Sequence, residues 1–139
     1  MNRRTALSLM LATTALAACG AAPGSSGYVV PAPQEGQGLI VAYRPSSAFG
    51  SGLRFPLVVN SSLVGDLTNG TVITQNVPPG DYVVQTSAPS VDGTSSVSVP
   101  VAAGQTVFIK GEALWGYPTG RPRLLLVSDA QALSDLARL

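Results

Sequence analysis

The chain has 139 residues, a length that suits one domain of ordinary size, and charged residues make up only 11% of it. The formal net charge is +1 and the basic residues form no stripe, which excludes the usual phosphate-binding surface of a nucleic-acid-binding protein. There is no histidine, so neither a Ser-His-Asp triad nor a Cys-His pair can be assembled.

The chain begins with the pattern of a secretory signal peptide. Arg3 and Arg4 precede a mostly apolar stretch over 6–16, and small residues follow it. This stretch is too short for a transmembrane helix, which needs about 20 residues. The paired arginines also fit a twin-arginine export signal loosely, so the export route stays open. We expect residues 1–18 to be a signal peptide.

Cys19 is the only cysteine, and it directly follows Leu16-Ala17-Ala18. This placement resembles the lipobox of bacterial lipoproteins, in which the cysteine sulfur receives a diacylglycerol and becomes part of the first mature residue. The resemblance implies a palmitate-type anchor and a domain that faces the periplasm. Gly20 follows in place of an aspartate, which implies the outer membrane by similarity to sorting in enteric bacteria. The alternative is an ordinary signal peptide with an incidental cysteine.

Residues 19–37 are rich in Gly, Ser, Pro and Ala. Such a segment cannot bury enough apolar surface to offset the entropy lost on ordering. We expect a flexible tether that spans on the order of 20–25 Å. Tyr28, Val29 and Val30 are the exception, and they predict a short strand or an apolar patch.

The remainder, residues 38–139, has the pattern of an all-β domain. Short apolar runs alternate with turn signals about every ten residues, which is typical of a sandwich. We predict a single antiparallel β-sandwich of about seven strands, without a disulfide. Asn69-Gly70 is a two-residue hairpin signal, and Pro100 predicts an edge strand or a strand end. The apolar runs lie at 39–43, 55–59, 63–67, 71–75, 82–86, 96–101, 106–110 and 123–127.

One short α-helix is predicted at the C-terminus. Ser128 and Gln131 have the spacing of a capping box, and Asp129 places a negative charge in the first turn. Leu133 and Leu136 would then share one helix face with Ala137. We expect this face to pack on an open edge or an end of the sandwich.

The chain contains four segments in a characteristic order and spacing, at 41–47, 56–60, 64–70 and 76–82. Together they resemble a known family of bacterial lipoproteins, the family catalogued as domain of unknown function 2846. The resemblance spans residues 38–112 and implies a compact β-sandwich of the transthyretin-like or Ig-like kind, with no assigned activity. One departure is Asn60-Ser61-Ser62, where the family usually has an Asp-Gly-Lys type of hairpin.

Residues that could support catalysis are few. Lys110 is the only lysine and ends an apolar strand, where a solvated side chain is the ordinary outcome. Asp66 and Asp81 lie at turns, where aspartate commonly bonds its own backbone. A carboxylate pair or a weak calcium site built on these two is the alternative. We expect no enzyme activity, no metal and no cofactor.

Two segments are candidates for contact with a partner. The first is a long loop over 44–54 that carries Arg44, Phe49 and Arg54. The second contains Trp115 and Tyr117, residue types that are enriched at binding hot spots. The alternatives are that Phe49 folds back over the core together with Leu53, and that the single tryptophan fills the core or closes the end of the sandwich.

These observations favour a non-enzymatic lipoprotein that is attached to a membrane by N-terminal acyl chains and acts as an envelope interaction or accessory module. Its expected partner is an envelope protein, bound at a strand edge or at the two aromatic segments. No nucleic acid is expected. The rival hypothesis is a β-sandwich that binds a glycan or a small apolar molecule through Trp115 and Tyr117.

Overall fold

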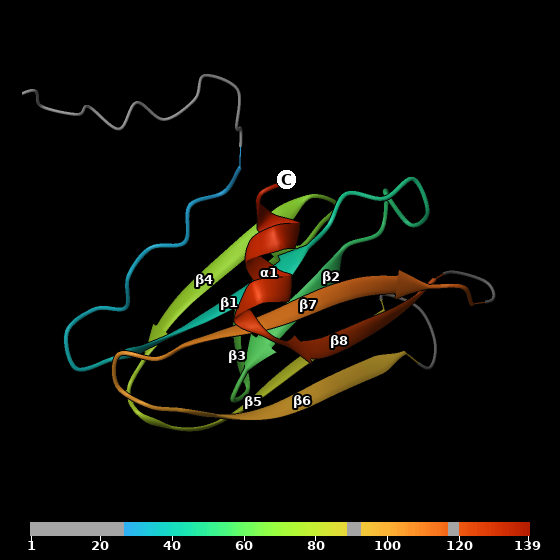
Figure 1. Ribbon diagram of the computed structural model, residues 1–139. Coiled ribbons are helices and arrows are strands. Elements are labelled where there is room, and N and C mark those ends of the chain that lie inside the picture. The colour runs from blue at the N-terminus through green and yellow to red at the C-terminus, as the bar shows by residue number, and fades with distance from the viewer. Residues whose placement is uncertain (1–26, 89–92, 117–119) are drawn as a thin grey trace, which may run out of the picture.

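A computed structural model describes residues 27–88, 93–116 and 120–139, and it shows two four-stranded β-sheets packed face to face with one short helix (Figure 1). The first sheet has the order β4 (Thr71–Val77), β1 (Gly38–Arg44), β7 (Thr106–Leu114), β8 (Arg121–Val127). The second sheet has the order β3 (Ser62–Leu67), β2 (Phe55–Val59), β5 (Gly80–Ser87), β6 (Thr94–Val101). The helix, α1, spans Asp129–Leu136.

The all-β sandwich with a C-terminal helix is confirmed in these described residues, with two corrections. There are eight strands rather than about seven. The strands are also not all antiparallel, because β1 and β7 run parallel over Leu39–Tyr43 and Thr106–Lys110. Parallel neighbours need a long crossover, and here the intervening chain builds β4 and the whole second sheet before it returns to the start of β1.

The core lies between the sheets and follows from alternation along the strands. Phe55, Leu57 and Val59 are buried on β2, and the residues between them are only half-buried. On β6, Val99 and Val101 are buried beside exposed neighbours. This strand forms the edge of the second sheet, as Pro100 predicts.

Two turns differ from their sequence patterns. Asn69-Gly70 does not close a hairpin, because β3 and β4 belong to different sheets. The chain crosses between the sheets there, and the Thr71 hydroxyl donates to the Thr68 carbonyl at 2.7 Å. The two-residue hairpin lies instead between β2 and β3, where Asn60 and Ser61 both take positive φ. Asparagine tolerates this conformation, so the turn forms without a glycine.

The outer face of the first sheet is partly covered by α1 (Figure 1). Ser128 caps the helix as predicted, since its side chain accepts from the Gln131 amide at 3.3 Å. Ala132 and Leu136 are the buried helix residues, whereas Leu133 is exposed. The helix therefore covers a sheet face rather than an edge or an end. Among the described residues, no helix is long and apolar enough to cross a membrane.

Residues 27–37, expected as part of the tether, run beside β4 and contact the domain (Figure 1). The Tyr28 amide donates to the Leu136 carbonyl at 3.1 Å. The Gln34 amide donates to Asn76 Oδ1 at 2.9 Å, and Val30 packs on the apolar cluster beneath α1. This segment and α1 together cover one half of the outer sheet face.

Candidate functional site

The two segments that the sequence analysis proposed separately meet at one corner of the sandwich. The chain leaves the first sheet after Arg44 and enters the second sheet at Phe55, so a loop over 45–54 caps this end. β7 ends at Leu114 at the same end, and Trp115 follows it directly. The rings of Phe49 and Trp115 lie 5.3 Å apart at 80°, an edge-to-face pair.

Trp115 does not fill the core, so the prediction of a core tryptophan is wrong. Its side chain is 86% exposed, Phe49 is 41% exposed, and Leu114 beside them is also exposed. Leu53 does pack on the core, as the other alternative proposed, but Phe49 does not follow it. We call Phe49, Leu114 and Trp115 the aromatic corner. Tyr117 and Cys19 lie outside the described residues.

Arg44 is 2% exposed, and it holds the loop from beneath. Its guanidinium donates to the carbonyls of Leu53 at 2.8 Å, Gly50 at 2.5 Å and Leu67 at 3.4 Å. It also lies 4.8 Å from the Phe55 ring centroid, within cation–π range. Burial lowers the pKa of Arg44. Arg44 therefore positions the loop and is not available for direct contact with a partner.

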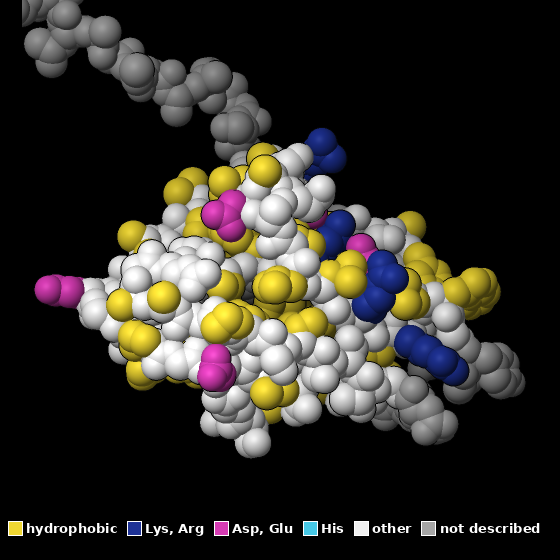
Figure 2. Space-filling view, turned by 60° about the horizontal axis from the view of Figure 1, so that its bottom comes forward, with side chains coloured by type: hydrophobic (Ala, Val, Ile, Leu, Met, Phe, Trp, Pro, Cys, Tyr) yellow, Lys and Arg dark blue, Asp and Glu magenta, His cyan; other side chains and the backbone are white. Residues whose placement is uncertain are grey.

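Arg54, the second arginine of this loop, has an exposed side chain. Arg121 is exposed as well and lies opposite Leu114 in the β7–β8 register. Figure 2 shows Lys and Arg side chains gathered towards one end of the molecule, where hydrophobic side chains also reach the surface. The aromatic corner thus has basic neighbours.

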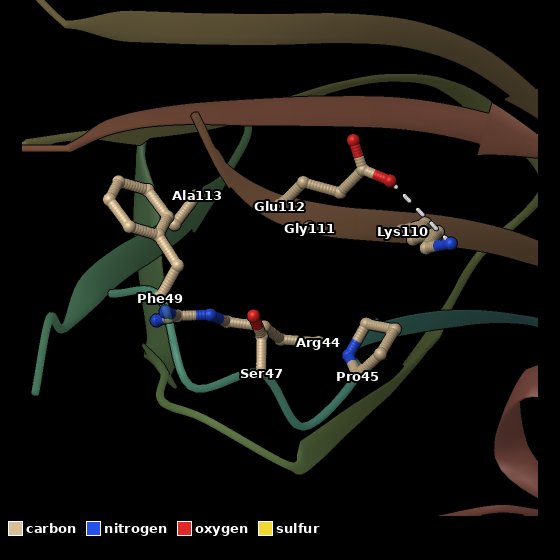
Figure 3. A pocket seen from close by; sticks show the side chains of 8 residues that line it. All are labelled: Arg44, Pro45, Ser47, Phe49, Lys110, Gly111, Glu112 and Ala113. Atoms are coloured by element: carbon tan, nitrogen blue, oxygen red, sulfur yellow. Dashed lines mark ion pairs between the residues drawn. The ribbon is translucent and has the colours of Figure 1, made fainter. Parts of the chain in front are cut away.

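A pocket of about 230 Å³ opens beside the aromatic corner, between residues 44–49 and strand residues 110–113 (Figure 3). The pocket exists because the pairing between β1 and β7 stops before β7 itself ends. β1 pairs with β7 only as far as Tyr43 and Lys110. Pro45 then leads the chain away, while β7 continues to Leu114. The space left beside β7 is the pocket.

Two residues that line this pocket, Lys110 and Glu112, belong to a row of four charged side chains of alternating sign, which we call the charge row. Lys110 Nζ lies 3.3 Å from an oxygen of Asp135 and 3.5 Å from an oxygen of Glu112. Arg123 donates to the other Glu112 oxygen at 2.8 Å. The row links α1 to β7 and β8, and its formal charges cancel.

The α1 end of the charge row is anchored on a buried tyrosine. The Tyr43 hydroxyl donates to Asp135 at 2.8 Å. Burial, reinforced by this hydrogen bond, raises the pKa of Tyr43 well above its usual range. Burial alone would raise the pKa of Asp135, but hydrogen bonds from Tyr43, Gln131 and Lys110 outweigh it and lower that pKa.

The two aspartates considered as catalytic or calcium-binding residues are both exposed. Asp81 has an exposed side chain, and its carbonyl accepts from Asn60 Nδ2 at 3.4 Å. Asp66 is exposed on the edge strand β3. In the part of the chain that the structure describes, no three Cys, Asp or Glu side chains gather in a group that could hold a metal ion.

Sequence reasoning missed two pocket residues, Ser47 and Glu112. The sequence did contain a signal for Glu112. Lys110 and Glu112 are charged residues two positions apart in a strand that begins with apolar residues, and residues two apart point to the same face of a sheet. Ser47 had none, since serine is ordinary in a loop.

Comparison of the chain with protein-family models, with curated proteins and with solved structures found no match. The resemblance of residues 38–112 to a lipoprotein family therefore stays a prediction. The features of the molecule that bear on its function are the geometry of the aromatic corner and its pocket.

Proposed function

We propose that the protein is a lipid-anchored, non-catalytic accessory module of the bacterial envelope that binds an envelope protein through its aromatic corner. The observation that carries this proposal is the exposed Trp115 paired edge-to-face with Phe49. Large aromatic side chains that remain exposed on a folded domain are typical anchors of protein interfaces.

The setting of the corner supports a binding role. Arg44 fixes the loop that carries Phe49, so this ring is presented with little conformational freedom. A preorganised surface loses less entropy on binding. Arg54 and Arg121 supply exposed guanidinium groups nearby, and arginine is also enriched at hot spots.

The anchor is the second part of the proposal. The signal-like residues 1–18 and the lipobox-like position of Cys19 support acylation, with the domain facing the periplasm at the outer membrane. The exchange Cys19→Ser removes the sulfur that would carry the lipid. Labelling with radioactive palmitate should then disappear, and labelling that persisted would refute the anchor.

The finer fold assignment also belongs to this proposal. Two facing four-stranded sheets with a buried interface are compatible with a sandwich of the transthyretin-like or Ig-like kind. A relative whose sheets are purely antiparallel would differ from this protein at the parallel β1–β7 pair, so this pair is the feature by which their folds should be compared.

Site-specific photocrosslinking in living cells tests the proposed interface. A photoreactive amino acid at position 115 should form one discrete protein adduct. The same group at Leu63 is the control, because Leu63 is 68% exposed but lies at the opposite end of β2 and β3. The proposal fails if position 115 gives no adduct, or if both positions give the same adducts.

A second candidate function is binding of a glycan or a small molecule at the same corner. The pocket beside Phe49 is the specific observation that favours it. The pocket's side chains also indicate which ligand class would suit it.

A further inference from the structure

The pocket beside the aromatic corner has the size of a site for one small ligand unit. Its volume is about 230 Å³. Pockets that enclose drug-sized ligands measure roughly 300–1,000 Å³, so this one suits a smaller group. The pocket is open to solvent on one side, and a unit of a longer chain could therefore enter it.

The pocket presents an apolar end and polar walls (Figure 3). Phe49 stands at one end and Lys110 at the other, with Glu112 and Ser47 between them. The Ser47 amide donates to Asn69 Oδ1 at 2.8 Å, which fixes the loop backbone. Among the described residues, the Ser47 hydroxyl has no hydrogen-bond partner, and its side chain is exposed. This hydroxyl can both donate to and accept from a ligand.

The charge row indicates that the ligand is neutral. Lys110 and Arg123 are already matched by Asp135 and Glu112. Arg44 also lines the pocket, but it is 2% exposed and donates to three backbone carbonyls, so each cation at the pocket already has partners. An anionic ligand would have to compete with Glu112 for its partners. A hydroxyl group has no such conflict, because carboxylates keep spare acceptor sites and the ammonium keeps a donor.

A pyranose ring meets these requirements, since it combines an apolar C–H face with hydroxyl groups that donate and accept. We infer that the pocket formed by Ser47, Phe49, Lys110 and Glu112 binds one neutral sugar residue of an envelope glycan. This inference rests on the proposed function only in treating the corner as a binding surface. It requires no protein partner at Trp115.

Titration by NMR tests the sugar site directly. The ¹⁵N-labelled full chain would be held in a detergent without a sugar headgroup and titrated with cellotriose, maltotriose, the N-acetylglucosamine trimer and, as the acidic control, trigalacturonate. We expect a neutral trimer to shift the amides of Ser47, Phe49 and Gly111. Trigalacturonate should bind more weakly than that neutral trimer.

Two variants make the test specific. Ser47→Phe places a bulky side chain at the pocket mouth and should weaken binding by about tenfold or more. Ser51→Phe is the matched control, because Ser51 is exposed on the same loop but does not line the pocket, and it should bind as the parent does. Glu112→Gln removes a charged acceptor and should weaken the neutral trimer, whereas trigalacturonate should gain affinity because Lys110 and Arg123 lose the carboxylate that competes with it.

Three results would overturn the inference. The first is that no neutral trimer shifts the amide signals, and the second is that Ser47→Phe binds the neutral trimer as well as the parent does. The third is that the parent binds trigalacturonate more tightly than it binds every neutral trimer. The crosslink from position 115 is scored separately in the Ser47→Phe chain. Loss of sugar binding with the crosslink retained supports the pocket as an independent site. Sugar binding without any protein crosslink also supports the inference, while it refutes the proposed protein partner.

Discussion

The outer face of the first sheet has two halves that differ sharply, although β1 and β7 contribute to both. In one half, Leu39, Val41 and Phe108 are buried beneath α1 and residues 27–37. In the other half, Lys110 and Glu112 border a pocket, and Leu114 reaches the aromatic corner. The covered half joins the domain to its N-terminal segment, and the open half carries the candidate site.

The boundary between the halves coincides with a change of residue type along β7. The outward positions of this strand run from Phe108 to Lys110, Glu112 and Leu114. Burying an unpaired charge costs far more than burying an aliphatic group gains. The helix therefore covers β7 only up to the position where its charged residues begin. Asp135 on the helix pairs with the first charged residue, Lys110. The single strand β7 thus supplies both a structural face and the face that carries the candidate site.

The covered half should respond most strongly to loss of apolar contacts. Leu136→Ala removes a fully buried side chain from beneath α1. We expect the free energy of unfolding to fall by about 2–5 kcal/mol, because a cavity replaces packed methyl groups. Denaturant titration followed by circular dichroism measures the change. Leu133→Ala on the exposed side of the same helix should cost much less, and equal losses would contradict the division of the helix into two faces.

The open half depends on one buried cation beneath its surface. Arg44→Met keeps much of the side-chain length but leaves three carbonyls without their donor. We expect a loss of about 2–4 kcal/mol, since an unsatisfied buried acceptor costs about 1–3 kcal/mol and only the bond to Leu67 is fully buried, whereas those to Gly50 and Leu53 are part-buried.

The control for this prediction is Arg54→Met, because Arg54 is exposed on the same loop. Surface substitutions of this kind usually change stability by less than about 0.5 kcal/mol. Similar losses in the two variants would contradict the positioning role of Arg44. Hydrogen exchange at the Gly50 and Leu53 amides would show whether the loop loosens.

The sequence predicted the strands well, because alternation and turn residues act locally. The run 55–59 and the alternating 96–101 both became strands, and in the second the valines lie on the more buried side. The sequence did not predict that α1 and residues 27–37 cover half of the outer sheet face, although the composition of β1 indicated a strand that is covered on both faces. All seven of its residues are buried, and a continuous apolar run is typical of a strand covered on both faces.

The candidate site depends on contacts between distant parts of the chain, which local patterns do not specify. The residue types at Phe49 and Trp115 indicated binding, but nothing in either segment indicated that the two rings touch. Arg44 looked like a surface residue because arginine is rarely buried. Its burial depends on carbonyls presented by Gly50, Leu53 and Leu67, and tertiary structure alone brings these together.

The charge row joins the two halves, and acid should weaken that junction. The pKa of Asp135 is lowered in the folded protein, so the folded state favours its charged form. Its contribution to stability is therefore complete above the unfolded pKa, which is about 3.9, and is lost as pH falls through the folded value. Asp135→Asn should cost about 1 kcal/mol at neutral pH. It should also flatten the dependence of unfolding free energy on pH below about 4. An unchanged acid slope would contradict the role given to Asp135.

The smallest expected effect on stability comes from the most exposed side chain. Trp115 is 86% exposed, and among the described residues its ring forms an edge-to-face pair with Phe49. An aromatic pair contributes about 0.5–1.5 kcal/mol, and the low end applies to a pair so exposed to water. Trp115→Ala should therefore lower the free energy of unfolding by about 0.5 kcal/mol or less. The same exchange should abolish partner capture by a photoreactive group placed at Leu114. A large loss of stability would instead assign Trp115 a structural role like that of Leu136, and the division between a structural half and a binding half would no longer hold.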